Sequence, residues 1–358
     1  MADNKMCSDS RRSEDEKYMR RCIGLARNGL CNTPPNPMVG AVVVCDGRII
    51  GEGYHVRCGE GHAEVNAVRS VKDPALLTRS TIYVSLEPCA HYGKTPPCAD
   101  MLVEKGIPRI VIGCEDPFAR VAGRGIRKLR EAGREVVVGV LEDECRHLIR
   151  RFLTFHACKR PYVTLKWAQS ADGYIDRCRT EGSPVVLSSP QTAMLVHKLR
   201  AEHSAIMVGR RTALLDNPSL TVRRWYGKSP VRVVLDRQLT LPGALHLLDG
   251  AVPTLVFTGC RHEPLPGVEY VQVDFSRDVL PQVLAELHAR GLQSLLVEGG
   301  NELLQSFLDA GLWDEIMVEE APALLGSGVP APRVDGHVPY ERLQVFGRSF
   351  RHYEMRHY

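Results

Sequence analysis

The hydrophobic positions of the chain form short apolar runs that alternate with stretches of helical spacing. In the first half, β-rich runs flank Asp46-Gly47 and predict a hairpin, because Asp-Gly accepts the positive φ angles of a tight turn. Further strands are expected at Ser80–Leu86, Arg109–Gly113 and Glu135–Val140, and helices at Tyr18–Asn28, His62–Val71, Pro97–Lys105, Gly125–Ala132 and Glu142–Phe155. Strands that alternate with helices predict a layered α/β sheet.

The second half restarts this alternation after a break at Lys159-Arg-Pro161. Strands are expected at Tyr162–Trp167, Ala205–Val208, Val231–Leu235, Thr254–Phe257 and Ser294–Val297, and helices at Pro190–Glu202, Val279–Arg290 and Glu302–Ala310. Residues 1–16 alternate in charge without apolar periodicity and are predicted to be a disordered tail. The pattern therefore predicts two α/β domains, residues 17–158 and 159–358.

Composition narrows the classes of function. The 46 basic and 42 acidic residues give a net charge of +4 with no basic patch, which argues against binding of duplex nucleic acid but allows a small anionic substrate. The N-terminus lacks the apolar core of a signal peptide, and no apolar run approaches the ~18 residues of a membrane span. We therefore expect a cytoplasmic protein without membrane contact, whose twelve cysteines are reduced.

Three residues in the first half have the types and order of a catalytic zinc site. His62 is followed by Glu64, and two Pro-Cys pairs supply Cys89 and Cys98. Zinc prefers nitrogen and sulfur ligands, and a catalytic site keeps the fourth position for a water whose pKa the metal lowers. A carboxylate two residues from the histidine can carry protons from that water to the leaving group. This is the pattern of nucleobase deaminases, with eight residues between the cysteines instead of two.

Two other interpretations of these residues stay open at this point. The cysteines could be unrelated core residues, or the site could be structural, with a fourth ligand from His55, Cys58 or His91. Neither interpretation gives Glu64 a task, so the catalytic one is favoured.

At these motifs the sequence resembles the bifunctional deaminase/reductases of riboflavin biosynthesis, over nearly the whole chain after the tail. The matching segments are Pro35-Asn-Pro-Met-Val-Gly40, His62-Ala-Glu-Val-Asn-Ala67, Leu86-Glu-Pro-Cys-Ala-His-Tyr-Gly-Lys-Thr-Pro-Pro-Cys98, Val121-Ala-Gly-Arg-Gly125, Leu165-Lys-Trp-Ala-Gln-Ser-Ala-Asp-Gly173, Thr212-Ala-Leu-Leu-Asp-Asn-Pro-Ser-Leu-Thr221 and Val297-Glu-Gly-Gly300. The long insert between the cysteines is the mark that separates this family from cytidine deaminases.

The resemblance implies a fold and two consecutive reactions. A cytidine-deaminase-like α/β/α sandwich would be followed by an α/β domain similar to dihydrofolate reductase. The first domain would use Zn²⁺ to deaminate 2,5-diamino-6-ribosylamino-4(3H)-pyrimidinone 5′-phosphate. The second would use NADPH to reduce the ribosyl group of the product to ribityl. A homo-oligomer formed through the reductase domain is also expected.

The resemblance also assigns residues to the two sites. In the deaminase, Glu64 would be catalytic, His62, Cys89 and Cys98 would bind the metal, and Asn36, His55, His91 and Lys94 would bind substrate. In the reductase, Arg200, Leu220, Arg223 and Glu298 would bind substrate, and Ala168, Thr212, Asp216, Gly299 and Gly300 would bind the cofactor. Taken alone, Lys94 and the arginines are typical of solvated surface, and a Gly-Gly pair is typical of an ordinary turn. Lys166, Ser170 and Asp172 lie in a matching motif but receive no role.

The sequence departs from the family pattern at three positions near the expected pockets. Phe118 and Pro184 replace polar residues expected near the two substrates, and Val186 replaces an aromatic residue expected near the cofactor. These changes leave the zinc chemistry intact and bear on the affinity for substrate and NADPH.

The sequence bears on three alternative functions. A deaminase with an inactive second domain is compatible with the sequence, because in hydride transfer the cofactor carries the chemistry. A deaminase that edits nucleic acid would need a basic, aromatic-lined groove, yet only 6% of the residues are aromatic. A binding module held together by zinc leaves Glu64 unexplained.

Overall fold

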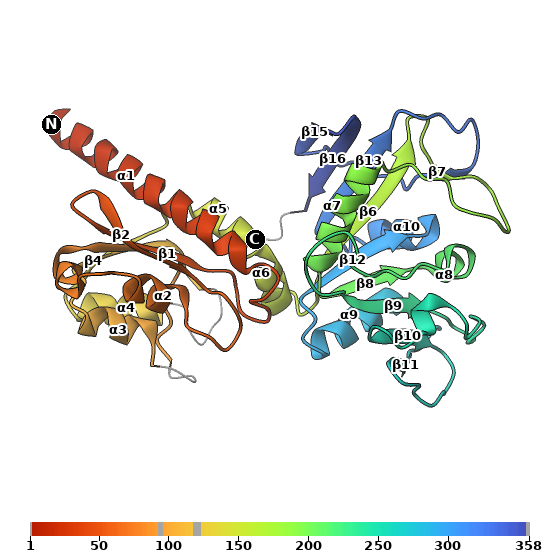
Figure 1. Cartoon of the computed structure of the whole chain (residues 1–358), viewed down its shortest axis with the longest axis horizontal. Helices are drawn as coiled ribbons and strands as arrows, with labels where there is room; N and C mark the ends of the chain where they lie inside the picture. Colours follow the sequence, from red (N-terminus) through yellow and green to blue (C-terminus); the bar gives the residue numbers. More distant parts are fainter. Residues whose placement is uncertain (1, 92–95, 117–122, 356–358) are drawn as a thin grey trace. The chain divides into compact units, whose positions relative to one another are not determined.

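The computed structural model describes residues 2–91, 96–116 and 123–355. The chain divides into two compact units, Met1–His156 and Ala157–Tyr358 (Figure 1). This division falls two residues before the boundary expected between residues 158 and 159. No helix in the described ranges combines the length and the apolar character needed to cross a bilayer.

The first unit is built on a five-stranded sheet with the order β2-β1-β3-β4-β5. Its strands are β1 (Gly40–Cys45), β2 (Arg48–Tyr54), β3 (Thr81–Leu86), β4 (Arg109–Cys114) and β5 (Glu135–Val138). β1 pairs antiparallel with β2 and with β3, whereas β3, β4 and β5 run parallel. β1 and β2 form the hairpin expected at Asp46-Gly47, where both residues have positive φ angles (50° and 70°).

Helices cover both faces of this sheet. They are α1 (Ala2–Ala26), α2 (Ala63–Arg69), α3 (Cys98–Glu104), α4 (Arg124–Glu131), α5 (Glu142–Leu148) and α6 (Arg150–Ala157), with 3-10 turns η1 (Arg27–Gly29) and η2 (Pro74–Arg79). Val43 and Ile82 pack on the face covered by α2, α3 and α4, and Val42 and Tyr83 on the face covered by α1 and α5. The α/β/α sandwich expected for this half is confirmed.

The N-terminal segment corrects one prediction. Where a disordered tail was expected over residues 1–16, helix α1 begins at Ala2 and continues to Ala26. Asp15 is buried and accepts hydrogen bonds from Arg109 on β4 (2.8 and 2.9 Å) and from the hydroxyl of Tyr83 on β3 (3.0 Å). Asp15 and Arg109 are 94 residues apart in the sequence. Without knowledge of this distant partner, the alternating charges of the N-terminal segment resemble those of a solvated tail.

The second unit contains a nine-stranded sheet with the order β11-β10-β9-β8-β12-β6-β13-β16-β15. Its strands are β6 (Tyr162–Ser170), β8 (Ala205–Val208), β9 (Val231–Leu235), β10 (Thr254–Thr258), β11 (Val268–Gln272), β12 (Ser294–Gly299), β13 (Glu315–Ala321), β15 (Glu341–Val345) and β16 (Arg348–Glu354). The strands from β11 to β13 are parallel, and β16 and β15 continue the sheet in antiparallel fashion. A separate ribbon pairs β7 (Tyr174–Asp176) with β14 (Val329–Pro330).

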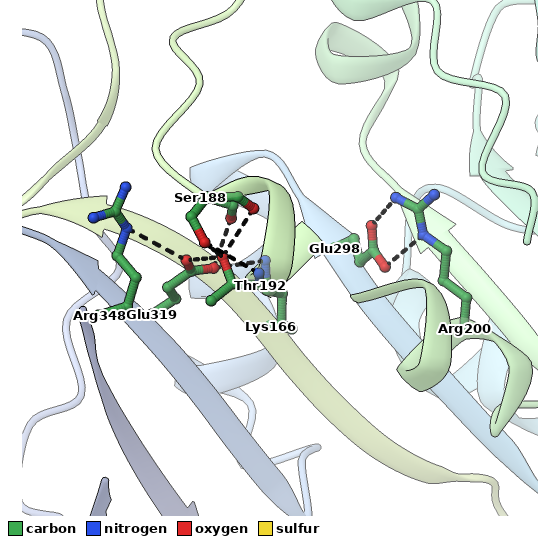
Figure 2. A network of polar contacts seen from close by, with 8 residues as sticks. Lys166, Ser188, Thr192, Arg200, Glu298, Glu319 and Arg348 are labelled. Carbon is green, nitrogen blue, oxygen red and sulfur yellow. Dashed lines mark hydrogen bonds and ion pairs between the residues drawn. The ribbon is translucent and has the colours of Figure 1, made fainter. Parts of the chain in front are cut away.

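Two apolar clusters on opposite faces of this sheet hold the second unit together. The helices are α7 (Pro190–Ala201), α8 (Arg210–Asp216), α9 (Val279–Ala289) and α10 (Asn301–Asp309), with the 3-10 turn η3 (His246–Leu248). Leu165 and Trp167 of β6 pack in the cluster that includes α9 and α10. Strand alternation turns Lys166 and Ala168 to the opposite face, over which α7 lies (Figure 2). The α/β class predicted for this half is confirmed.

Removal of the Asp15 carboxylate should destabilise the first unit. Asp15→Ala leaves Arg109 and Tyr83 without their buried partner, and loss of one partner of a buried pair costs about 3–5 kcal/mol. The control is Glu16→Ala, which removes only partly exposed pairs with Arg12 and Arg20 and should cost less than about 1 kcal/mol. Urea denaturation of both variants measures this difference, and equal losses would contradict the role given to Asp15.

Candidate functional site

Three side chains that the sequence singled out converge in the first unit. His62 lies at the N-cap of α2, Cys89 follows the end of β3, and Cys98 is the first residue of α3. Their ligand atoms lie within 4.8 Å of one another, with His62 Nδ1 3.6 Å from Cys89 Sγ and 3.4 Å from Cys98 Sγ. One nitrogen and two sulfur donors fit Zn²⁺ and leave a fourth coordination position for water.

The backbone around the two cysteines favours a thiolate. The N–H of Cys98, at the start of α3, donates to Cys89 Sγ at 3.3 Å, and the N–H of Ala99 donates to the carbonyl of Cys89 at 3.1 Å. The pKa of Cys89 is lowered to about 4, mainly by the hydrogen bond from the Cys98 thiol, with His62 adding to the effect. A thiolate is the form that binds a metal.

Glu64 lies in the first turn of α2 and is buried. Burial raises the pKa of Glu64 to about 7, although the charge of His62 opposes the shift. A carboxyl group with a pKa near neutrality can both accept and release a proton at the working pH, as general acid–base catalysis requires.

His55 and Asn36 form the wall next to the three ligands. His55 is buried, and its ring lies edge-on to that of His62 with centroids 5.5 Å apart. Burial lowers the pKa of His55, so its neutral ring donates from Nδ1 to the carbonyl of Gly61 (3.2 Å) and accepts at Nε2 from the Asn36 amide (3.1 Å). Both ring nitrogens are thus engaged away from the metal position.

The other candidates for a fourth ligand are less favourable. Cys58 and His91 are exposed, and Lys94 lies outside the described residues, as does the departure at Phe118. Within the described part of the chain, the group able to hold a metal consists of His62, Cys89 and Cys98. Three ligands beside a buried carboxylate are typical of a catalytic zinc site rather than a structural one.

Glu87 is a structural element of this site to which the sequence analysis gave no role. Its buried carboxylate accepts hydrogen bonds of 2.9–3.3 Å from the backbone N–H groups of Asp116, Gly123, Gly125 and Ile126. A Cβ at Gly125 would lie 2.0 Å from the carbonyl oxygen of Pro88. Glu87 therefore ties the segment that carries Cys89 to the start of α4, a contact that the Leu86-Glu-Pro-Cys89 motif alone does not disclose.

The second unit contains a cleft of about 1250 Å³ beside the carboxyl ends of β6, β8 and β12. Its lining includes all five predicted cofactor residues and one predicted substrate residue, namely Ala168, Thr212, Asp216, Gly299, Gly300 and Glu298. Pro184 and Val186 also line it, and Val186 is 84% exposed, so an aliphatic side chain stands where the family has an aromatic one.

The Gly299-Gly300 turn joins β12 to α10 at the cleft. Gly300 has φ +87°, and a Cβ at Gly299 would lie 3.0 Å from Thr212 Cγ2, so side chains are excluded where the backbone meets the cleft. Asn301 follows at the N-terminus of α10, and within the described chain its buried side-chain oxygen has no hydrogen-bond partner. Backbone N–H groups at a helix N-terminus bind phosphate, and an unpartnered acceptor can receive an amide N–H.

Asp216 is held by a neighbouring arginine. Arg179 forms ion pairs with Asp216 and with Asp176, the second at 2.7 Å, and donates to the carbonyl of Gly182 at 2.9 Å. These contacts fasten the loop after β7 to the end of α8 at the cleft wall.

Glu298 and Arg200 form a partly buried pair that joins β12 to α7 (Figure 2). Arg200 donates from Nε and Nη2 to the two carboxylate oxygens at 2.9 and 2.6 Å, and from Nη1 to the carbonyl of Thr221 at 3.3 Å. Arg223 is exposed, and its backbone N–H donates to His197 Nδ1 on α7 at 3.1 Å. Leu220 is buried in the apolar cluster, so only its backbone can face a ligand.

Lys166 also lines the cleft, although the sequence analysis assigned it no role. Burial lowers the pKa of Lys166, and the carboxylates of Glu298 and Glu319 oppose that shift. The other two unassigned residues of its motif make a turn, in which Ser170 donates to Asp172 at 2.6 Å and Asp172 accepts from the backbone N–H of Gly326 at 2.7 Å. The sequence signal that could have pointed to a role for Lys166 is a charged residue within a largely apolar predicted strand.

Both units match models of known families. Residues 12–114 match the cytidine and deoxycytidylate deaminase zinc-binding region, and residues 161–345 match the RibD C-terminal domain. Among curated proteins, the riboflavin biosynthesis protein RibD of Aquifex aeolicus is 41% identical over 323 residues, which cover 89% of this chain and 90% of that protein. The protein of the same name from Bacillus amyloliquefaciens is 41% identical over 332 residues, covering 90% of this chain and 88% of its own.

Solved structures give the same relationship. A diaminohydroxyphosphoribosylaminopyrimidine deaminase/5-amino-6-(5-phosphoribosylamino)uracil reductase from Thermotoga maritima is 37% identical, with a TM-score of 0.88 over 96% of this chain and 99% of that one. RibD from Acinetobacter baumannii is 33% identical, with a TM-score of 0.84 over the same shares. With a zinc-binding deaminase unit and an NADPH-dependent reductase unit in one polypeptide, the chain belongs to the RibD family of bifunctional deaminase/reductases of riboflavin biosynthesis.

Proposed function

We propose that the first unit deaminates 2,5-diamino-6-ribosylamino-4(3H)-pyrimidinone 5′-phosphate and that the second unit reduces the ribosyl group of the product. The observation that supports this most strongly is the convergence of His62, Cys89 and Cys98 within 4.8 Å, beside a buried Glu64. A coupled assay tests the proposal directly, because the first step releases ammonia and the second consumes NADPH.

In the deaminase, His62, Cys89 and Cys98 would hold Zn²⁺, which supplies a bound water with a pKa lowered to about 7. Glu64 would accept a proton from the attacking water and donate it to the pyrimidine ring nitrogen. A second proton, from the hydroxyl group that the water leaves on the ring carbon, would pass through Glu64 to the departing ammonia. Asn36, oriented by its hydrogen bond to His55, offers its amide oxygen to the substrate. His91 and Lys94 would meet the phosphate.

In the reductase, NADPH supplies a hydride to the ribosyl C1′, and the reaction consumes one proton. The Gly299-Gly300 turn and the N-terminus of α10 bind a cofactor phosphate, with Thr212, Asp216 and Ala168 along the same wall. Glu298, fixed by Arg200, binds the sugar, and the exposed Arg223 binds the substrate phosphate. The Lys166 ammonium faces the same cleft and would donate a hydrogen bond to the sugar.

A deaminase with an inactive second unit is the alternative. It predicts ammonia release without NADPH oxidation, even when the deaminated product is supplied. The cleft with its glycine turn supports the bifunctional case, because an inactive domain would have no need to keep side chains out of that turn.

We also propose that the protein is a homo-oligomer through the reductase unit and is cytoplasmic. Val338, Tyr340, Leu343 and Phe346, on and beside edge strand β15, are 39–85% exposed. An edge strand flanked by exposed apolar side chains favours pairing with a second copy. Light scattering of the purified chain measures the mass, and a monomer would refute the oligomer.

Glu64→Gln should retain zinc and lose deamination. The amide cannot exchange protons with the metal-bound water, so ammonia release should fall by about 100- to 10,000-fold. Reduction of supplied deaminated product should be unchanged. Near-normal ammonia release by a zinc-loaded variant would refute the role of Glu64.

Cys89→Ala and Cys98→Ala should each lose the metal, because two remaining ligands cannot complete a tetrahedral site. Cys58→Ala, which changes an exposed thiol in the same unit, is the control and should bind zinc normally. Metal analysis after gel filtration gives the readout. If either ligand variant keeps a full equivalent of zinc, the ligand set is wrong.

Glu298→Gln should impair reduction and leave ammonia release intact. The charge-assisted pair with Arg200 and the contact to the sugar are weakened, which predicts a loss of about 10- to 100-fold in kcat/KM for reduction. Glu286→Gln, on α9 and outside the cleft lining, is the control for removing a paired carboxylate. Unchanged reduction kinetics in folded Glu298→Gln would rule out the substrate role.

A further inference from the structure

A buried carboxylate lies behind the reductase cleft, and neither proposed reaction uses it. Glu319 is in the middle of β13 and its side chain is 0% exposed. It does not line the cleft, yet Figure 2 shows it at the centre of a polar network next to the Glu298–Arg200 pair. A charged group at such a depth is retained only if partners compensate for its lost hydration.

Two hydroxyl groups, one just before α7 and one in its first turn, donate to Glu319. Ser188 donates to Oε2 and Thr192 to Oε1, each at 2.6 Å. Ser189, between them, accepts at its hydroxyl oxygen from the N–H of Thr192 at 3.2 Å and so caps α7. Since Ser188 lines the cleft, Glu319 anchors part of the cleft wall to the sheet.

Two cations also approach Glu319. Lys166 Nζ, on neighbouring strand β6, lies 3.9 Å from Oε2, and Arg348 Nε, on β16, lies 3.9 Å from Oε1. Lys166 is the one of the two that lines the cleft. The β6–β13 register pairs Ala168 with Glu319, so Glu319 lies on the sheet face that carries Lys166 and Ala168.

Among the described residues, the charges that act on Lys166 come from three elements. Glu298 on β12 and Glu319 on β13 are negative, and Arg200 on α7 is positive. Arg348 on β16 approaches Glu319 from a further element. Arg200 already neutralises Glu298 through two hydrogen bonds. Glu298 and then Glu319 are the two carboxylates that counteract the effect of burial on the Lys166 pKa, and Glu319 is the one of them that has no bidentate arginine partner.

We propose that Glu319 is a positioning residue of the reductase, which holds Lys166 as an ammonium at the cleft and anchors the Ser188 wall against which NADPH binds. The inference rests on the proposed reductase function, and it assigns two separable tasks to one carboxylate. The charge acts on Lys166, and the hydrogen bond to Ser188 acts on the cleft wall.

The charge is tested with Glu319→Gln in the full chain. Loss of the negative charge lowers the pKa of Lys166, so the alkaline limb of kcat/KM for reduction should move to lower pH by about one unit. Glu320→Gln is the matched control, because Glu320 is the next residue of β13 and pairs with Arg351 at 3.3 Å instead. Its pH profile should equal that of the wild type. An unshifted limb in folded Glu319→Gln overturns the electrostatic task.

Two further variants separate charge from structure. Glu319→Asp keeps the charge, so its alkaline limb should stay within a few tenths of a unit of the wild type; a limb shifted as in Glu319→Gln overturns the charge argument. Ser188→Ala keeps Glu319 and Lys166, and should raise KM for NADPH about 2- to 10-fold without moving the limb. An unchanged KM for NADPH overturns the proposal that Glu319 anchors the cleft wall through Ser188. Because Ser188→Ala keeps Glu319, this measurement tests the proposal even if Glu319→Gln does not fold.

A measurement without turnover distinguishes this inference from the proposed function. The protonation of Lys166 is followed by NMR of the full chain with ¹³C-methylated lysines, its resonance identified by its absence in Lys166→Arg. Glu319→Gln should lower the titration midpoint by about one unit, and Glu320→Gln should leave it unchanged. Equal midpoints overturn the inference. A shifted midpoint in a protein that never oxidises NADPH supports the electrostatic effect of Glu319 on Lys166 and refutes the reductase function.

Discussion

Parallel strands end at a common edge, and both candidate sites depend on this constraint. In the first unit, Cys89 follows β3, and the first turns of α2 and α3 bring His62 and Cys98 to the same point. In the second unit, the ends of β6, β8 and β12 line one cleft. Ligands bind at this edge in open α/β sheets because backbone groups and helix N-termini meet there without side chains in the way. The two halves thus use one geometrical solution for hydrolysis and for hydride transfer.

At both sites, buried or partly buried carboxylates have roles that their partners determine. Burial raises the pKa of Glu64 to about 7 against the opposing charge of the nearby His62, which suits it to proton transfer. Glu87, by contrast, is saturated by four backbone N–H groups and serves as a clamp. Glu298 is fixed by one arginine, and Glu319 by two hydroxyls and two cations. The number and charge of the partners, rather than the residue type, decide what each carboxylate can do.

The sequence predicted the features that local pattern determines. The hairpin at Asp46-Gly47, the main strands and the zinc motif depend on neighbours within a few residues or on a specific spacing. Features built from distant partners were missed. The N-terminal helix depends on Asp15 meeting Arg109 across 94 residues, and β13 carries three glutamates that mask its apolar positions. Lys166 and Glu87 stood inside recognised motifs, but their roles depend on contacts across the sheet. The reductase residues could be assigned only through family resemblance, because arginines and glycine pairs are common.

The central claim is that one chain carries a zinc-dependent deaminase and an independent NADPH-dependent reductase. The most direct test is a simultaneous measurement of ammonia release and NADPH oxidation by the full chain on the diaminopyrimidinone phosphate, before and after removal of zinc by a chelator. The account predicts one NADPH oxidised for each ammonia released by the zinc-loaded protein. After chelation, ammonia release should stop while supplied deaminated product is still reduced. Ammonia release that survives the loss of zinc, or no NADPH oxidation with either substrate, would contradict it.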